Sequence, residues 1–178
     1  MELLVVLLVG GIMMAAIYGV INTAQRSSTG TERRVIAQQD ARVALELMAM
    51  EIRMASLNPT SAPDIWVNPA DCPTASGNMA ARGIQEATAD ALAIEMDISG
   101  SADPDFPSDG AIDDPNEIIR YSYNAASKYV TRSTNCGGNQ PFLGATNAAA
   151  EAKTVLVENE AAGIPLFRYY DGSGAELA

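Results

Sequence analysis

The chain has 178 residues, of which 22 are acidic and 11 are basic, so its formal net charge at neutral pH is −11. It contains no histidine and only two cysteines, which excludes an imidazole base, a histidine-ligated metal, a four-cysteine zinc site and a c-type haem motif. The acidic balance argues against nucleic acid as a partner, because binding to phosphate needs a basic surface. The composition therefore favours a protein that is not an enzyme and that binds no nucleic acid.

The charges divide the chain into two parts of different character. Residues 1–57 hold five acids and five bases, whereas residues 58–178 hold seventeen acids and six bases. We therefore expect two domains: a hydrophobic and amphipathic N-terminal helix over residues 1–57, and an acidic, β-rich globular head over residues 58–178.

The uncharged run LLVVLLVGGIMMAAIYGVI covers Leu3 to Ile21 and has 19 residues. At about 1.5 Å per residue, a helix of this length spans a hydrocarbon core of about 30 Å. No basic segment precedes the run, so an uncleaved single-pass membrane anchor is favoured over a cleaved secretory signal. Glu2 stands at the edge of the run. Its carboxylate either lies among lipid headgroups or pairs with a chain-terminal amine, because the run itself contains no cation.

A second helical stretch follows, from Glu32 to Leu57. Its apolar residues recur at spacings of three, four or seven, as on one face of a helix. They are Ile36, Val43, Leu47, Met50, Met54 and Leu57. We expect this stripe to pack on the downstream domain. The helix should end before Asn58-Pro59, because the residue before a proline avoids the helical conformation. The Ser/Thr-rich segment from Asn22 to Thr31 is the expected weak point.

The combined length of these two stretches limits where the helix can lie. A continuous helix of about 57 residues would be about 85 Å long, which no domain of this size encloses. Its apolar half must therefore lie in lipid, against copies of itself, or in each in turn.

The N-terminal sequence MELLVVLLVGGIMMAAIYG resembles the start of type IV pilins and of the pseudopilins of type II secretion. In that superfamily a processed, N-methylated phenylalanine is followed by threonine, leucine, an apolar residue, then glutamate and Leu-Leu-Val. Met1-Glu2-Leu3-Leu4-Val5 matches this pattern from its fourth residue onward, which makes Glu2 the counterpart of the family glutamate. Residues 38–59 are further similar to the large minor pilins and the J-type pseudopilins.

This resemblance implies an α+β fold, in which a long N-terminal helix packs on a small antiparallel sheet. It implies a structural subunit of a pilus-like or pseudopilus filament, with Glu2 neutralising the terminal amine of an adjacent subunit. The implied partners are copies of the chain or other pilins, contacted through the helix, and the bacterial inner membrane before assembly. The head would lie in the periplasm, and the filament would be extracellular or periplasm-spanning. By themselves, Arg26, Arg33 and Arg34 would instead place the head in the cytoplasm, and a basic leader would be needed to reverse that orientation.

Several alternating or β-branched segments of the head predict strands. These segments are Leu92–Ile98, Glu117–Tyr123, Lys128–Arg132, Thr154–Val157, Leu166–Tyr170 and Ala175–Leu177. Asn124–Ser127 and Asp171–Gly174 are the expected turns between them. The last strand predicts either a short edge strand or an edge that a separate chain completes, because an open edge invites pairing.

Cys72 and Cys136 are the two cysteines of the chain. In an exported head, a disulfide between them is the favoured interpretation, and two reduced, unrelated cysteines are the alternative. Closing a loop of this length would contribute about 4 kcal/mol in the chain-entropy model.

Ten acids and no base lie between Glu86 and Glu117, with the highest density over residues 97–117. Carboxylates on a flexible loop are ligands that calcium prefers, although the spacing here does not fit the pattern D-x-D-x-D-G-x₅-E. A solvated acidic loop is the favoured interpretation, calcium is the alternative, and no other cofactor is expected. A glycosidase pair is disfavoured, because nothing in the sequence fixes the separation of two carboxylates.

Three function classes stay open beside the filament subunit. They are a minor or tip subunit that primes assembly, a membrane-anchored calcium-dependent binding module, and an anchored hydrolase that uses carboxylates. The absence of histidine and the long helix disfavour the hydrolase.

Overall fold

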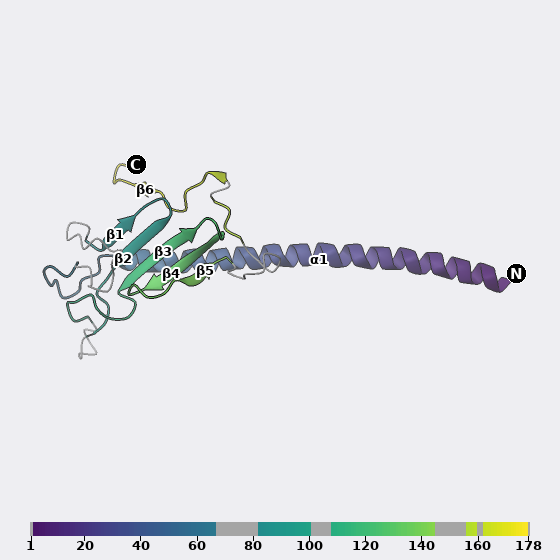
Figure 1. Ribbon diagram of the computed structural model, residues 1–178, viewed down its shortest axis with the longest axis horizontal. Coiled ribbons are helices and arrows are strands. Elements are labelled where there is room, and N and C mark those ends of the chain that lie inside the picture. Colours follow the sequence, from purple (N-terminus) through teal and green to yellow (C-terminus); the bar gives the residue numbers. More distant parts are fainter. Residues whose placement is uncertain (1, 67–81, 101–107, 145–155, 160–161, 178) are drawn as a thin grey trace. The chain divides into compact units, whose positions relative to one another are not determined.

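The computed structural model describes residues 2–66, 82–100, 108–144, 156–159 and 162–177, with the side chain of residue 2 left out. It consists of one long helix and a five-stranded antiparallel sheet, which confirms the expected α+β fold (Figure 1). The helix α1 covers Glu2–Met54. The strands are β1 (Ile84–Ala87), β2 (Ala91–Glu95), β3 (Ile118–Asn124), β4 (Tyr129–Thr134), β5 (Gln140–Leu143), β6 (Tyr169–Tyr170) and β7 (Glu176–Leu177).

The chain forms two compact units, residues 1–42 and residues 43–178. The first unit consists of the N-terminal part of α1. The second unit contains the last turns of α1 together with the strands. The expected boundary after residue 57 follows the end of the helix, whereas the compact units divide within the helix.

Helix α1 is continuous through the Ser/Thr-rich segment that was expected to be weak. The hydroxyls of Thr23, Thr29 and Thr31 donate to the carbonyls of residues 19, 25 and 27, at 2.9, 2.9 and 3.1 Å. Because each hydroxyl is satisfied within its own helix, these polar residues need no partner elsewhere to stay helical. The segment therefore continues the helix instead of breaking it.

The helix ends at Met54, ahead of the expected stop at Asn58-Pro59. Ser56 adopts a positive φ of 67°, which is incompatible with a further helical turn. Its amide donates to the carbonyl of Glu95 at 2.9 Å, and the amide of Asp97 donates to the carbonyl of Leu57 at 2.9 Å. The chain thus leaves the helix by pairing with the end of β2, before the proline is reached.

Strands β1 to β5 form a meander, in which each strand pairs with the next one in sequence. The expected strands at Leu92–Ile98, Glu117–Tyr123 and Lys128–Arg132 correspond to β2, β3 and β4. Strands β1 and β5 were not expected. The expected strand at Thr154–Val157 lies partly outside the described residues, and its described part, Leu156 and Val157, has no strand geometry.

The C-terminal segment forms a separate two-stranded sheet, in which β6 pairs with β7. The expected turn at Asp171–Gly174 connects these strands. The side chain of Asp171 accepts hydrogen bonds from the amides of Ser173 and Ala175 at 2.9 and 2.8 Å. This network is an Asx turn, which explains why the turn is readable from the sequence.

The main core lies between the sheet and the last turns of α1. Paired residues of neighbouring strands share a face, so Leu92, Tyr121 and Arg132 all point toward the helix. The buried members of this core are Met48, Leu92, Ile94, Met96, Ile119, Tyr121, Tyr123, Val130 and Val157.

The helix face that contacts this core differs from the predicted stripe. The buried helix residues of the second unit are Ala44, Met48 and Glu51, at spacings of four and three. By contrast, Val43 and Met50 of the predicted stripe are 64% and 52% exposed. Met54 of the predicted stripe does pack against the core, and Leu47 is half-buried. The prediction of the packing face was therefore correct only in part, because it counted only apolar side chains and the actual face includes a small residue and a carboxylate.

Glu51 is the polar link between helix and sheet. Its two oxygens accept hydrogen bonds from Nη2 and Nε of Arg132 at 2.7 and 3.3 Å. The hydroxyl of Tyr121 also donates to Glu51. Burial, followed by the contact with Glu51, raises the pKa of Tyr121 well above its usual value, so this hydroxyl stays protonated as a donor. The buried carboxylate is thus paired and hydrogen-bonded, the condition under which an internal charge is tolerated.

We predict that Glu51→Ala lowers the free energy of unfolding by about 2–3 kcal/mol, because it leaves Arg132 and Tyr121 without their shared acceptor. Glu46→Ala is the matched control, since Glu46 is exposed on the same helix. Its substitution should change stability by less than about 0.5 kcal/mol. Urea unfolding of the detergent-solubilised chain, followed by the fluorescence of Trp66, measures both. Equal stability of the two variants would contradict a structural role for Glu51.

Candidate functional site: an apolar helix surface and an acidic loop

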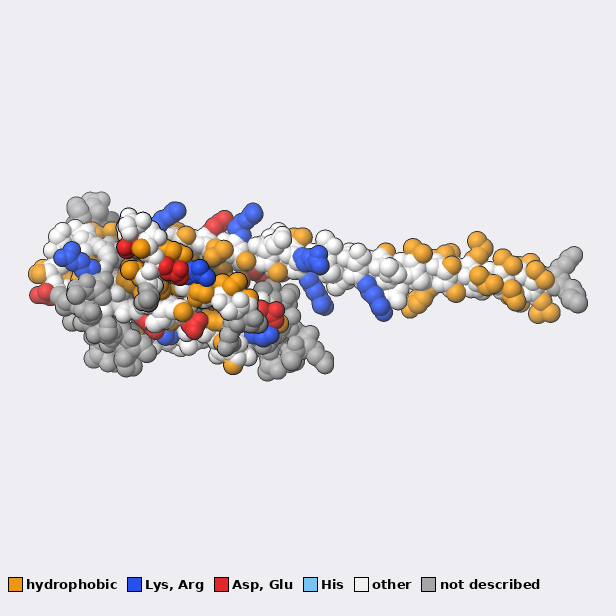
Figure 2. Space-filling model, turned by 90° about the horizontal axis from the view of Figure 1, so that it is seen from above, with side chains coloured by type: hydrophobic (Ala, Val, Ile, Leu, Met, Phe, Trp, Pro, Cys, Tyr) orange, Lys and Arg blue, Asp and Glu red, His pale blue; other side chains and the backbone are white. Residues whose placement is uncertain are grey.

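The N-terminal part of α1 presents a wholly apolar and exposed surface. Every large hydrophobic side chain from Leu3 to Ile21 is between 49% and 75% exposed. The most apolar 18-residue window has a mean hydropathy of 2.6, and none of it is buried. Figure 2 shows hydrophobic side chains, in orange, along this part of the helix, with white backbone between them. The helix is long and apolar enough to cross a membrane. We call residues 3–21 the stem surface.

A second apolar surface lies on the part of α1 that belongs to the compact unit 43–178. It consists of Val43, Leu45, Met50 and Ile52, which are exposed although they are large and hydrophobic. Residues seven apart lie on the same side of a helix, so Val43 and Met50 share one flank, and Leu45 and Ile52 share the opposite flank. The charged residues Glu46 and Arg53 lie between the two flanks, on the side away from the sheet. We call these four apolar residues the exposed apolar flanks.

Two of the predicted site residues lie where the structure gives little or no geometry. The backbone of Glu2 begins α1, but its side chain is outside the described part, so its partner is untested. Cys72 also lies outside the described residues. Cys136 is not a free thiol and packs beside Ile65, Ile112 and Ile118 in a second, smaller core. The pairing of Cys72 with Cys136 stays a prediction.

The acidic loop between β2 and β3 is organised by Glu117, which is fully buried. Its Oε1 accepts hydrogen bonds from the amides of Ile98 and Ser99, both at 3.0 Å. Its Oε2 accepts from the amides of Asp113 and Asp114, at 3.0 and 2.8 Å. One carboxylate thus fastens the two ends of the loop together. Because both oxygens are occupied by backbone donors, Glu117 is a structural residue of the loop.

Three further carboxylates of this loop converge. Asp109, Asp113 and Asp114 each offer an oxygen, and these oxygens lie within 4.8 Å of one another. Gly100, which has a φ of +96°, closes the cluster from the other side of the loop. A Cβ at that position would clash with the carboxylates of Asp114 and Asp109. Burial and the negative charges of Glu117, Asp113 and Asp109 raise the pKa of Asp114.

Asp97 adds a buried carboxylate beside this cluster. Its Oδ2 accepts a hydrogen bond from the amide of Gly110 at 3.0 Å, whereas its Oδ1 has no partner in the described part of the chain. Burial, with further contributions from the charges of Glu117 and Asp109, raises the pKa of Asp97. Ser108, buried next to Asp109, likewise has a side-chain oxygen without a partner among the described residues.

Glu95 is a second buried carboxylate with an incomplete set of donors. Gln85 donates to its Oε2 at 2.8 Å, and Oε1 has no partner within the described ranges. Burial raises the pKa of Glu95 to about 7, and the hydrogen bond from Gln85 only partly opposes this rise. Glu95 lies on the sheet face opposite the main core, because its neighbours Ile94 and Met96 point into that core.

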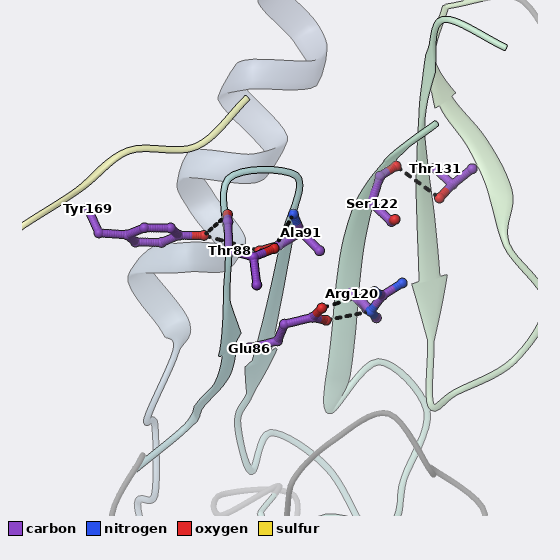
Figure 3. A network of polar contacts seen from close by, with 7 residues as sticks. All are labelled: Glu86, Thr88, Ala91, Arg120, Ser122, Thr131 and Tyr169. Atoms are coloured by element: carbon purple, nitrogen blue, oxygen red, sulfur yellow. Dashed lines mark hydrogen bonds and ion pairs between the residues drawn. The ribbon is translucent and has the colours of Figure 1, made fainter. Parts of the chain in front are cut away.

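Two sets of polar contacts lie near strands β1 to β3, an ion pair on the sheet and the bonds that hold the C-terminal segment (Figure 3). Glu86 accepts two hydrogen bonds from Arg120, at 2.6 and 3.1 Å. The hydroxyl of Tyr169 donates to the carbonyls of Thr88 and Ala91 at 2.9 and 3.2 Å. Burial, together with the charge of Glu86, raises the pKa of Tyr169 to about 12. The amide of Phe167 also donates to the carbonyl of Ala89 at 3.0 Å, so the segment that leads into β6 is fastened to the β1–β2 turn by both backbone and side-chain bonds.

Comparisons with protein-family models, with curated proteins and with solved structures find no match for this chain. The resemblance to pilins therefore stays a prediction from the sequence. The functional argument rests on the exposed apolar residues of α1.

Sequence reasoning missed the separate roles of the acidic residues. It treated residues 97–117 as one acidic loop, whereas Glu117 binds backbone amides and Asp109, Asp113 and Asp114 face one another. Spacing alone does not separate these roles. The available indication was the position of Glu117, which is the first residue of a predicted strand and is therefore placed to hold the base of the loop.

We predict that Glu95 makes the protein less stable as the pH rises from about 4.5 to about 7. The folded chain binds more protons than the unfolded chain in this window, so the free energy of unfolding falls as the pH increases. Glu95→Gln removes the titration and should stabilise the chain at pH 8 by about 2 kcal/mol relative to the unsubstituted chain, with little difference at pH 4. Urea unfolding at several pH values measures this change.

Glu158→Gln is the matched control for Glu95→Gln, because Glu158 is exposed and pairs with Lys128 at 2.9 Å on the surface. Surface ion pairs contribute little, so this substitution should leave the difference between pH 4 and pH 8 unchanged. A Glu95→Gln chain that keeps the full pH dependence would show that other groups cause it.

Proposed function

We propose that this protein is a structural subunit of a pilus-like or pseudopilus filament, assembled by packing of its N-terminal helices. In the membrane, the stem surface anchors the subunit as a single-pass precursor. In the filament, the same surface exchanges lipid for the helices of neighbouring subunits. The protein acts by packing against neighbouring subunits, and the head lies on the outside of the filament.

The observation that carries this proposal is that exposed apolar surface continues beyond the stretch a membrane covers. A bilayer core of about 30 Å covers about 20 helical residues, which the stem surface already supplies. Val43 and Leu45 are nevertheless 64% and 62% exposed, well beyond Ile21. A lipid anchor needs no apolar residues there. Neighbouring helices or heads would cover the exposed apolar flanks and remove them from water, which stabilises the assembly.

The proposal assigns Glu2 the role that the pilin resemblance implies. A carboxylate inside an apolar helix bundle is stabilised by a nearby cation, and the stem surface contains none. The terminal amine of an adjacent subunit supplies that cation and thereby sets the axial register between subunits. The head is placed in the periplasm before assembly, where Cys72 and Cys136 form a disulfide. The blocked state of Cys136 supports this pairing.

We predict that Leu45→Glu abolishes filament formation while leaving the monomer folded. Leu45 is 62% exposed, so the substitution disturbs little within one chain but places a charge in the proposed contact between subunits. Filaments sheared from cells are quantified by immunoblot. The thermal midpoint of the purified, detergent-solubilised chain reports on folding.

Gln39→Glu is the matched control for Leu45→Glu, because it introduces the same charge at an exposed polar position of the same helix. It should give filaments at close to the normal yield. If Leu45→Glu also assembles normally, the flank that contains Leu45 takes no part in packing, and a membrane-anchored module that never polymerises becomes the better interpretation.

We predict that Glu2→Ala leaves membrane insertion intact but reduces assembly strongly, because the terminal amine of the neighbouring subunit then lacks its counter-ion. Membrane fractionation measures insertion, and the sheared-filament assay measures assembly. Glu32→Ala, at an exposed position of the same helix, is the control and should assemble normally. Unchanged filament yield from Glu2→Ala would eliminate the register role.

The same preparations separate a shaft subunit from a minor or tip subunit that primes assembly. A shaft subunit is the dominant protein of purified filaments, whereas a priming subunit is present in few copies and its deletion removes the whole filament. Counting this chain per unit length of filament decides between the two.

A further inference from the structure

The part of α1 that directly follows the stem surface carries a group of arginines that the filament proposal does not use. Arg26, Arg33 and Arg34 are three of the eleven basic residues of the chain, and all three are exposed. Within the described part of the chain none of them forms an ion pair, and neighbouring Glu32 forms none either. A chain with a net charge of −11 therefore keeps an unneutralised positive segment at this one place.

Two of these arginines flank a shallow hollow on one side of the helix. Arg26 and Arg33 are seven residues apart and therefore lie on the same side of α1. Figure 2 shows basic side chains, in blue, projecting from the helix beyond its orange N-terminal part. A Cβ at Gly30 would meet no atom within 4 Å, so the space between the two arginines is open. The hollow is lined by Asn22, Gln25, Arg26, Thr29, Gly30 and Arg33, and no acid is among these residues.

The chemistry of this lining selects an anion with several oxygens. A guanidinium group donates two parallel hydrogen bonds to a phosphate, and the amide groups of Asn22 and Gln25 add further donors. The hydroxyl of Thr29 already donates to the carbonyl of Gln25 at 2.9 Å, so it offers only an acceptor. Because the arginines are exposed and hydrated, such contacts are weak for a free anion. They become effective where the anion is held at high local concentration.

The position of the hollow supplies that concentration. The headgroup layer adds about 5–8 Å on each side of the hydrocarbon core. Arg26 follows Ile21 by five residues, which is about 7.5 Å along the helix, so it lies at the depth of the headgroups. Arg33 lies about 18 Å from Ile21, but helical side chains lean toward the N-terminus and thus back toward the membrane. The surface potential of an anionic membrane extends over a Debye length of about 10 Å beyond the headgroups.

We propose that Arg26 and Arg33, with Arg34 beside them, bind the headgroups of anionic phospholipids where the stem surface leaves the bilayer. The phosphate group lies in the hollow between the two guanidinium groups. This contact fixes the depth of the stem in the bilayer and opposes release of the subunit from the membrane. It rests on the membrane-anchored state of the proposed function and not on filament assembly.

The test measures how the full chain distributes between two kinds of vesicle. The chain is reconstituted from detergent into an equal mixture of neutral phosphatidylcholine vesicles and sucrose-loaded vesicles that also contain phosphatidylglycerol, which sedimentation separates. Its net charge of −11 alone would exclude it from the anionic vesicles. We expect the opposite, a preference for the anionic vesicles of about tenfold at low salt. In about 1 M sodium chloride, where the Debye length is about 3 Å, the preference should disappear.

The double variant Arg26→Gln, Arg33→Gln tests the hollow itself and should lose the preference. Arg42→Gln, Arg53→Gln is the matched control, because it removes the same charge from exposed positions of the same helix. Arg42 lies about 30 Å beyond Ile21, outside the reach of the headgroups, so the control should keep the preference. Circular dichroism checks that both variants stay helical. Equal distribution of the original chain, or equal losses in the two double variants, overturns the proposal.

The acidic head of a neighbouring copy is the other anionic surface that could attract these arginines. The vesicle experiment is therefore repeated at about one chain per vesicle, where copies do not meet. A preference that persists at this density supports the lipid headgroup as the ligand. A preference that appears only at high chain density, and is lost on dilution, overturns the proposal in favour of contact between copies.

Flotation with neutral vesicles alone separates this inference from the proposed function. A chain that inserts into them but shows no preference for anionic lipid refutes only the headgroup site. A chain that does not insert at all refutes the headgroup site and also the membrane-anchored precursor of the filament proposal.

Discussion

The N-terminal half of α1 has apolar side chains that its own chain does not cover in the described structure. Every large hydrophobic residue from Leu3 to Ile21 is at least 49% exposed, and the compact unit 1–42 consists of this helix. Burying apolar surface yields roughly 25 cal/mol per Å², so an isolated helix of this kind is not stable in water. Lipid or other helices must supply the missing contacts. This requirement, and not a catalytic group, is the constraint on which the proposed function depends.

The second constraint is that buried acidic side chains must be stabilised in a head that has few basic residues. The structure uses three different solutions. Glu51 receives a cation and a hydroxyl from the sheet, Glu117 receives backbone amides, and Glu95 is held by Gln85 with a pKa raised to about 7. Each solution removes or balances the cost of a buried carboxylate. The carboxylates of Asp109 and Asp113 are instead exposed to water, and Asp109 also accepts a hydrogen bond from the amide of Ala111 at 2.9 Å.

The sequence patterns correctly predicted those elements whose formation depends on local residue spacing. The long helix, β2 to β4 and the Asp171–Gly174 turn follow from helical spacing, alternation and turn chemistry, and the structure confirms them. Strands β1 and β5 were missed because IQEA and QPFL are short and do not alternate clearly. The prediction of the packing face of α1 left out Glu51, which is buried by its partners Arg132 and Tyr121. These partners lie 81 and 70 residues away in sequence. No local pattern contains that information, and the same holds for the convergence of the aspartates.

The way α1 packs on its own sheet also explains why the same helix can contact its own head and still expose apolar side chains. Its inward contacts use Ala44, Met48 and an ion pair at Glu51, with Met54 partly buried beside them. The larger residues Val43, Leu45 and Met50 are thereby left exposed on the flanks of the helix. A face built instead from the predicted stripe would have buried Val43 and Met50 within the chain and removed them from the exposed apolar flanks. The polar attachment to the head is directional, so it fixes which apolar residues stay exposed for the proposed contacts with neighbouring subunits.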